Sequence, residues 1–435
     1  MISKLSLPGY GMSSDAGNDL NRYSRMLKIY RILFLFLLGS LFGWKGKATV
    51  KETLVDLGME NVKVAVQAGG VCIAYEDNVY RGTYRGLFEV IRTLLDEPDI
   101  ADENIQLAVL ENGIPQIRVS LDREFVSAYR QGRLSLAAVM KGLAISYDTD
   151  EVMKALKGTK AVNRSAGKVD LVLYPQVRLQ NSWLDKIYGA VLDIAPAVEI
   201  GLWKGASFTG QVIFPVWNNL VGEMDYIRAG MLVVRQEIRL PKNVFATLSV
   251  GNFNQDRIGV DLNLLYHTNS DRWAFGLSGG LTGASTFYGG RWEVTQWRRV
   301  NGSVLVRYNE PYYNLQFDLS AHRYIYGDYG VRGDCSRHFG EITVGLFAMY
   351  SEGEVNGGFH FAIPLPRKKR SKHRAVRMRL PEYFDWQYEA QSGPRYTSRR
   401  LGRSYETRPD ENRNRTYYNP DFIKDNLVIL AEQSK

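Results

Sequence analysis

The chain has 435 residues, a net charge of +9 and two cysteines, Cys72 and Cys335. Beyond its N-terminal segment it holds no run of roughly 18 apolar residues, which excludes a helical membrane protein. The two cysteines fall in different predicted domains and have no metal-ligand neighbours. We therefore expect neither a structural disulfide nor a metal site at these residues.

Residues 1–48 are predicted to contain an export signal. Lys28 and Arg31 precede an apolar run over residues 32–44, and Ala48 offers a cleavage point. The run is too short to span a bilayer, which favours a cleaved signal peptide over an inner-membrane anchor. Met26 begins a well-proportioned signal of its own and is a candidate for the true start. No cysteine follows the apolar run, so we expect no lipoprotein anchor.

Residues 49–153 predict a small periplasmic α+β domain. Valines that alternate on either side of a turn at residues 67–70 predict a first hairpin. Apolar residues recur at helical spacing over residues 87–95, and Pro98 ends that helix. A second hairpin turns at Asn112 and Gly113, a pair typical of tight β-turns. A further helix is expected over residues 123–130.

Residues 154–167 are polar and without periodicity, as is typical of a linker. From residue 168 to residue 366 the chain becomes a series of strands that alternate apolar with polar residues. Leu262 and Tyr266 fall on one face of such a strand, for example, while Asp261 and His267 fall on the other. Thirteen segments fit the pattern, but single-chain bacterial barrels have an even strand number. The segment near residues 292–308 is the least regular, and we predict about 12 strands.

Strand length separates a membrane-spanning barrel from a soluble one. Transmembrane strands need roughly 9 to 11 residues, whereas soluble sandwiches and lipocalin-like barrels usually use shorter strands. Aromatic residues also gather near the predicted strand ends, where interfacial girdles lie. We predict a mainly β fold in which an antiparallel outer-membrane β-barrel over residues 168–366 follows the α+β domain. A soluble barrel is the alternative, and export followed by a membrane barrel implies a Gram-negative outer membrane.

Residues 367–435 carry most of the basic excess, with 17 Lys and Arg against 9 Asp and Glu. The run RKKRSKHR directly follows the last predicted strand and suits anionic lipid headgroups. A nucleic-acid patch conflicts with the export signal, so no nucleic-acid partner is expected. Arginines interleaved with tyrosines farther on favour either docking on an acidic partner or disorder. We predict a basic, partly disordered periplasmic tail.

Two stretches of the chain resemble a known family. One is NVYRGTYRGLFEVIRTLL in the small domain, and the other is YIYGDYGVRGDCSRHFGEITVGLFAMYSEGEVNGGFHFAIPLP at the end of the barrel. With the order of signal, small domain and barrel, they resemble the YjbH-like outer-membrane proteins, encoded with exopolysaccharide and group 4 capsule genes. The resemblance covers about residues 49–366 and implies a role in moving or organising polysaccharide. It brings no catalytic motif, and the tail does not match it.

Eight inward-facing side chains are predicted to form a polar track for sugar hydroxyls or uronate groups. They are Asp170, Arg178, Arg257, Asp261, Arg307, Asp318, His322 and Glu341. Carboxylates and guanidinium groups supply the acceptors and donors that glycans require. The alternative is that these charges pair with one another and plug the pore.

We predict a non-enzymatic outer-membrane barrel that serves exopolysaccharide or capsule export or assembly. None of the five histidines stands in a metal-spaced pair or beside a nucleophile motif, so we expect no metal and no cofactor. Polysaccharide, outer-membrane lipid and other export proteins are the expected partners. Two alternatives stay open, namely a barrel enzyme that modifies lipid or glycan through a Ser/His site, and a structural barrel with a plugged lumen.

Overall fold

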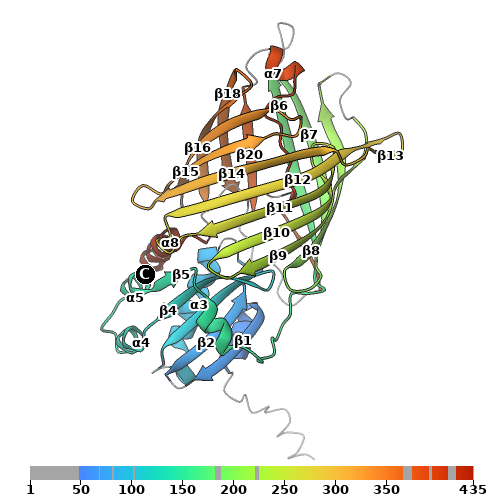
Figure 1. Cartoon of the computed structure of the whole chain (residues 1–435). Coiled ribbons are helices and arrows are strands. Elements are labelled where there is room, and N and C mark those ends of the chain that lie inside the picture. The colour runs from blue at the N-terminus through green and yellow to red at the C-terminus, as the bar shows by residue number, and fades with distance from the viewer. Residues whose placement is uncertain are drawn as a thin grey trace, which may run out of the picture. The chain divides into compact units, whose positions relative to one another are not determined.

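The computed structural model describes residues 49–434 except 68, 81–82, 101–102, 182–187, 221–224, 366–374, 391–393 and 410–417. The predicted signal segment and the RKKRSKHR run lie outside these described residues. The described chain builds a small sheet with helices and a much larger, curved sheet (Figure 1).

The small sheet has the order β1-β2-β3-β4-β5. Its strands are β1 (Glu60–Gln67), β2 (Gly70–Glu76), β3 (Ile105–Glu111), β4 (Ile114–Leu121) and β5 (Ala144–Ser146). Only β2 and β3 pair in parallel among these strands, and α3 (Thr83–Asp96) connects them. Both predicted hairpins are confirmed, and Asn112 and Gly113 have the positive φ angles of 51° and 73° that their tight turn requires.

Helices cover this sheet and enclose its apolar core. They are α2 (Val50–Leu57), α3, the 3-10 turn Pro98–Ile100, α4 (Arg123–Arg130), α5 (Leu136–Gly142) and α6 (Asp150–Ala155). The helices expected before Pro98 and over residues 123–130 are thereby confirmed. In the described part of the chain, no helix is both long and apolar enough to cross a membrane.

The C-terminal helix α8 (Pro420–Gln433) belongs to this core, although its residues were predicted to lie in a partly disordered tail. Phe422, Ile423 and Leu427 are buried among side chains of the small domain. The Asn419 side chain caps the N-terminus of the helix, because its oxygen accepts a hydrogen bond of 3.0 Å from the Phe422 amide. The tail is basic overall, but its last segment is an amphipathic helix whose apolar face packs against the small domain.

The larger sheet has 15 strands. Those that follow one another as antiparallel neighbours are β6 (Val169–Asn181), β7 (Tyr188–Gly201), β8 (Ala206–Asn218), β9 (Arg228–Leu240), β10 (Val244–Phe253), β11 (Arg257–His267), β12 (Trp273–Tyr288), β14 (Arg299–Glu310), β15 (Leu315–Arg323), β16 (Tyr329–Phe339), β17 (Ile342–Ser351) and β18 (Glu354–Pro364). The short β13 (Arg291–Val294) pairs only with the end of β12 and explains the irregular segment near residues 292–308. The predicted total of about 12 strands is nevertheless too low, because β13 and two strands of the tail bring the sheet of the described residues to 15.

The two added strands are β19 (Val376–Arg379), which pairs in parallel with β6, and β20 (Tyr383–Glu389), which pairs antiparallel with β18. Residues 384–389 alternate apolar with polar side chains, as the earlier strands do. Trp386 lies with Phe359 and Phe361 on one face, while Gln387 and Glu389 line the interior on the other. The boundary predicted at residue 366 is therefore wrong, since the sheet continues to residue 389.

The two ends of the large sheet come together in space (Figure 1). The Trp386 indole Nε1 in β20 donates a hydrogen bond of 3.0 Å to the Val177 carbonyl in β6. Among the described strands, however, no backbone ladder joins β20 to β6. The sheet thus encloses an interior without the continuous ring of strand pairing that the prediction of a closed barrel contains.

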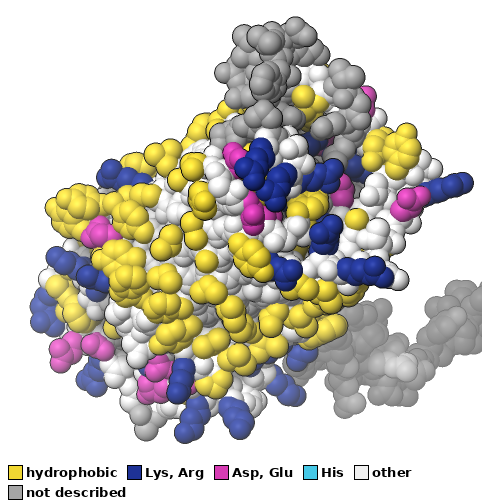
Figure 2. Space-filling model, turned by 45° about the horizontal axis from the view of Figure 1, so that its top comes forward, with side chains coloured by type: hydrophobic (Ala, Val, Ile, Leu, Met, Phe, Trp, Pro, Cys, Tyr) yellow, Lys and Arg dark blue, Asp and Glu magenta, His cyan; other side chains and the backbone are white. Residues whose placement is uncertain are grey.

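Inward and outward faces of this sheet differ sharply in chemistry. Every second residue of β17 is exposed, and residues such as Ile342 and Leu346 alternate with buried Thr343. In β11, Leu262 is 43% exposed, whereas its neighbour Asp261 is 5% exposed. Figure 2 shows apolar side chains spread over the outside of the sheet. The alternation therefore gives an apolar outer surface around a polar interior.

We expect Leu427→Ala to lower the free energy of unfolding by about 2–4 kcal/mol, because Leu427 is fully buried in the core and its loss leaves a cavity. Ile429→Ala, on the exposed face of the same helix, is the matched control and should change it by less than about 0.5 kcal/mol. Urea unfolding followed by tryptophan fluorescence measures both. Equal effects of the two variants would contradict the placement of α8 in the core.

Candidate functional site

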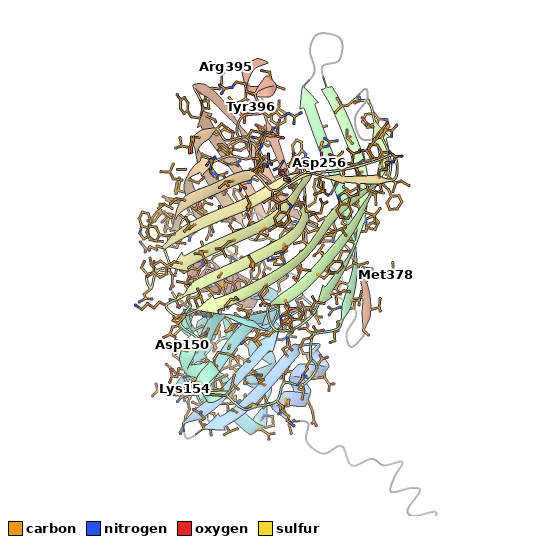
Figure 3. All side chains as sticks on the ribbon, turned by 45° about the vertical axis from the view of Figure 1, so that its right-hand side comes forward. Asp150, Lys154, Asp256, Met378, Arg395 and Tyr396 are labelled. Atoms are coloured by element: carbon orange, nitrogen blue, oxygen red, sulfur yellow. The ribbon has the colours of Figure 1, made fainter. Side chains whose placement is uncertain are left out.

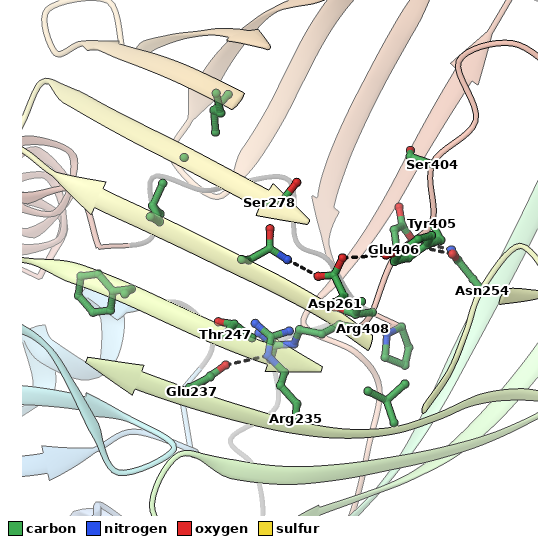
Figure 4. Close-up of a pocket in the computed structure, with 18 of the residues that line it drawn as sticks. Arg235, Glu237, Thr247, Asn254, Asp261, Ser278, Ser404, Tyr405, Glu406 and Arg408 are labelled. Atoms are coloured by element: carbon green, nitrogen blue, oxygen red, sulfur yellow. Dashed lines mark hydrogen bonds and ion pairs between the residues drawn. The ribbon is translucent and has the colours of Figure 1, made fainter. Parts of the chain in front are cut away.

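The interior of the large sheet contains a polar cavity of about 990 Å³. Several parts of the chain line it, of which three matter most here. The strands supply Asp261 and Asp318, the β3–β4 hairpin of the small domain supplies Glu111, and residues 402–409 supply Tyr405 and Arg408 (Figure 4). The cavity is the candidate site because polar side chains that the sheet turns inward gather around it.

Residues 394–409, which we name the C-terminal strap, enter the interior from the end of the sheet that faces away from the small domain. The strap begins with α7 (Pro394–Ser398), where Arg395 lies 3.6 Å from Glu354 at the start of β18. Figure 3 shows Arg395 and Tyr396 at the opposite end from Asp150 and Lys154. The strap then follows the inner face of the strands toward the middle of the cavity.

Hydrogen bonds and apolar contacts hold the first half of the strap. The Tyr396 hydroxyl donates to Glu389 at 2.7 Å, and the Gly402 amide donates to Asp328 at 2.8 Å. Leu401 is buried against Tyr324 and other side chains of the inner wall. This half of the strap is therefore packed into the wall like a further layer of side chains.

Tyr405 makes the main contacts between the second half of the strap and the inner wall. Its ring stacks on Phe253 with centroids 5.0 Å apart and an interplanar angle of 11°. Its hydroxyl lies 2.9 Å from an Asp261 carboxylate oxygen and 3.2 Å from the Asn301 amide oxygen. Figure 4 shows the dashed contact between Asp261 and Tyr405 beside the one between Glu406 and Asn254. Neither the stack nor these bonds was predicted, because the tail was placed outside the barrel.

Four of the eight predicted track residues line the cavity together on β11, β14 and β15, and the structure supplies a partner for each. Arg307 donates two hydrogen bonds to Asp318, at 2.7 and 2.6 Å. Asp261 accepts from Asn263 at 2.6 Å as well as from Tyr405. His322 lies 2.7 Å from the Ser320 hydroxyl and stacks on Tyr324. These contacts favour the alternative in which the inward charges are paired.

Asp170 also lines the cavity, but its partners come from the tail. Arg377 and Arg379 of β19 donate to its two carboxylate oxygens at 2.6 and 3.0 Å. Arg377 also donates to Glu60 of the small domain at 2.9 Å. This cluster joins three distant parts of the chain, which sequence spacing gave no means of predicting.

Three predicted track residues lie elsewhere, and the single polar track is corrected accordingly. Glu341 sits in the β16–β17 turn and binds Arg85 of α3 at 2.6 Å, so it joins the sheet to the small domain. Arg257 is buried against Thr282, to which it donates at 2.8 Å. Arg178 is exposed and is not among the residues that line the cavity. Alternation alone gives the face of a residue but not its height along a tilted strand.

A second polar cluster was missed on β16 and β18. Asp334 accepts from Arg332 at 2.8 Å and lies 2.7 Å from His360 Nε2. The Ser336 hydroxyl is 3.4 Å from the same nitrogen of His360. The alternation of residues 331–338 marks Arg332, Asp334 and Ser336 as inward-facing, so the signal was present in the sequence.

The geometry of the Asp334 cluster does not match a catalytic triad. In a triad the serine and the carboxylate contact opposite nitrogens of the imidazole. One nitrogen takes the serine proton, and the carboxylate on the other nitrogen stabilises the imidazolium that forms. Here Ser336 and Asp334 both lie on Nε2 of His360. In the described residues, no group of three or more His, Cys, Asp and Glu side chains could hold a metal ion.

The small domain closes the cavity from one end. Arg239 at the end of β9 donates to the backbone carbonyls of Pro115 and Gln116, both at 2.9 Å, and to that of Tyr147. Glu76, which lines the same end of the cavity, accepts the Gly113 amide at 2.8 Å. Burial raises the pKa of the Glu76 carboxyl, although its hydrogen bonds act in the opposite direction.

A family model for YjbH, described as exopolysaccharide biosynthesis protein YbjH, matches residues 42–377. The chain belongs to the YjbH family. The resemblance stated from the sequence is thereby confirmed for most of the YjbH chain, including the small domain and the twelve consecutive strands.

A search of curated proteins finds no match to this YjbH-family chain. Among solved structures it is similar to OmpTdeltaL8, a loop L8 deletion mutant of OmpT, an outer membrane protein of Vibrio cholerae. That match has a TM-score of 0.27 and 8% sequence identity, and it covers 45% of this chain and 86% of the other.

We expect Asp318→Asn to lower the free energy of unfolding by roughly 3 kcal/mol, because it leaves the buried Arg307 guanidinium without its carboxylate. The double variant Arg307→Met with Asp318→Leu should recover most of that loss, since it leaves no unpaired charge. Asp96→Asn, at an exposed helix end, is the control. A loss from Asp318→Asn no larger than that of Asp96→Asn, measured by urea unfolding, would show that the pair contributes nothing.

Proposed function

We propose that this protein is a non-enzymatic outer-membrane component of exopolysaccharide export or assembly, with its small domain in the periplasm. One observation carries the proposal. A large curved sheet turns apolar side chains outward and encloses a polar cavity of about 990 Å³. The apolar outer surface suits contact with lipid, and the polar cavity suits a hydroxyl-rich polymer. Membership of the YjbH family, which is described by exopolysaccharide biosynthesis, indicates that this polymer is a polysaccharide.

Strand dimensions support insertion in a membrane. The twelve consecutive strands have 9 to 16 residues, and a tilted strand needs roughly 9 to 11 to cross the hydrocarbon. Exposed aromatic residues such as Tyr266, Trp273 and Tyr312 lie at one end of the sheet, and Tyr288 and Tyr329 lie at the other. These positions match the two interfacial girdles of outer-membrane barrels.

The inner surface supports a binding or guiding role more than a chemical one. Its carboxylates, guanidinium groups and amides are mutually hydrogen-bonded, as in the Arg307–Asp318 pair. Such pairs present oriented donors and acceptors to sugar hydroxyls. The Ser336–His360–Asp334 grouping in the cavity wall lacks the geometry that nucleophilic catalysis requires.

A structural barrel with a plugged lumen is the second candidate, and the C-terminal strap favours it. Residues 402–409 occupy part of the interior, and their contacts with Asp328, Asp261 and Asn254 hold them there. In that case the protein would organise export partners at the membrane without conducting the polymer itself.

Deletion of the gene should lower or alter surface polysaccharide without blocking growth. Expression of the wild-type gene should restore it, and expression of Ser336→Ala should restore it equally well if no catalysis at Ser336 is involved. Uronic acid and neutral sugar assays of the cell surface and medium measure the effect. An unchanged glycan in the deletion strain, with the gene expressed in the parent, would contradict the proposal.

Leu319→Arg should prevent assembly in the outer membrane. Leu319 is 62% exposed in the middle of β15, where an arginine costs about 2–4 kcal/mol if the surface lies in hydrocarbon and almost nothing if it lies in water. Tyr312→Arg, at an 81% exposed turn position, is the matched control. Outer-membrane fractionation and the shift in mobility between boiled and unboiled samples report assembly. Normal assembly of Leu319→Arg would place this surface in water.

A further inference from the structure

Tyr405 fills a small site on the inner wall that has the chemistry of a sugar subsite. Phe253 forms its floor, and the Tyr405 ring lies flat on that floor at 5.0 Å. The Asp261 carboxylate accepts a hydrogen bond from the Tyr405 hydroxyl, and the Asn301 amide oxygen lies 3.2 Å from the same hydroxyl. Asn263 donates to the Asp261 carboxylate at 2.6 Å. The site therefore combines one aromatic face with a rim of carboxylate and amide groups.

A pyranose ring has the same two surfaces. One of its faces carries C–H groups that pack on an aromatic ring, and its edge carries hydroxyls that both donate and accept hydrogen bonds. Binding sites for small polar ligands likewise join an apolar wall to a few convergent polar groups. Tyr405, with a flat ring and a hydroxyl at its tip, imitates such a sugar.

The wall also leaves room for a hydroxyl at this position. A Cβ on Gly280 would lie 1.9 Å from the Tyr405 hydroxyl oxygen and 2.8 Å from the Asn301 amide oxygen. Any side chain at residue 280 would therefore fill the space in which the hydroxyl meets its partners. Glycine at this strand position therefore leaves a recess that holds the Tyr405 hydroxyl.

The strap holds this site through contacts that a glycan could replace. Around Tyr405, the Glu406 amide donates to Asn254 at 2.6 Å, and the Asn254 amide donates back to the Glu406 carboxylate at 3.0 Å. Nearer its start, the strap packs Tyr396 and Leu401 against Tyr324, whose hydroxyl is buried and has no hydrogen-bond partner among the described residues. An unsatisfied buried hydroxyl costs free energy that is recovered when the covering segment leaves.

We propose that Phe253, Asp261, Asn263 and Asn301 form a subsite for an uncharged pyranose residue of the exported polymer, and that Tyr405 occupies it in the resting protein. The inference rests on the proposed function and adds the ligand class and the residues. An uncharged sugar is specified because the Asp261 carboxylate would repel a uronate group at the rim. The polymer and Tyr405 compete for one site, so binding of the polymer displaces the strap.

The test measures binding of extracellular polysaccharide, purified from the strain that carries the gene, to the full mature protein in detergent. Because the polymer binds only molecules whose subsite is free, Tyr405→Ala should bind it about tenfold more tightly than the wild type. Tyr405→Phe, which keeps the stack and loses the hydroxyl, should lie between the two. Thr397→Ala, at an exposed strap position, is the control and should bind as the wild type does.

Adding Phe253→Ala to Tyr405→Ala should abolish the gain, because the floor of the subsite is then gone. Mobility of boiled and unboiled samples checks that each variant is folded. Equal binding by Tyr405→Ala and the wild type, no measurable binding by Tyr405→Ala, or a gain that survives Phe253→Ala would each overturn the subsite.

The outcome is separable from that of the proposed function. An unchanged glycan in the deletion strain contradicts the function itself. A lowered glycan in that strain, combined with unaltered polymer binding by Tyr405→Ala, overturns only the subsite. High salt should leave the binding of an uncharged sugar unchanged, whereas loss of binding in high salt would indicate a charged ligand and overturn the stated class.

Discussion

A charge buried on the inner face of the large sheet needs a partner, and much of the structure follows from where the chain finds one. Burial of an isolated carboxylate or guanidinium group is far more costly than burial of a hydrogen-bonded pair. Arg307 finds Asp318 on the neighbouring strand. Asp170, on the first strand, is instead paired by arginines of β19, more than two hundred residues later in the chain. The position of the tail is thus tied to the charges of the sheet.

The same tail connects the two parts of the molecule. Its strands border both ends of the large sheet, its strap lies in the interior, and α8 completes the core of the small domain. Arg377 contacts both Asp170 of the sheet and Glu60 of the small domain. With Arg85 bound to Glu341 on another side, the small domain is held to the sheet by ion pairs from separate segments. These contacts set which residues of the domain line the cavity.

The sequence was sufficient for the elements whose pattern is local. Alternation placed Leu262 outward and Asp261 inward, and the Asn112–Gly113 turn was found because that dipeptide tolerates positive φ. The sequence-based prediction was wrong for residues 367–435. The excess of arginine there suggested disorder, although the segment YFDWQYE has the alternation of a strand. Pairing partners such as Tyr405 and Asp261 depend on which strands meet in space, and single-sequence periodicity holds no such information. The height of Arg178 or Glu341 along a tilted strand was beyond it for the same reason.

The parallel pairing of β19 with β6 has a consequence for how the molecule is made. The first strand of the large sheet cannot acquire this neighbour until nearly the whole chain has been synthesised, which makes its contacts among the most nonlocal in the fold. Until then, β6 and β18 each present an unpaired edge, and such edges attract other chains. A nascent or truncated chain is therefore most exposed to misassembly at these two strands.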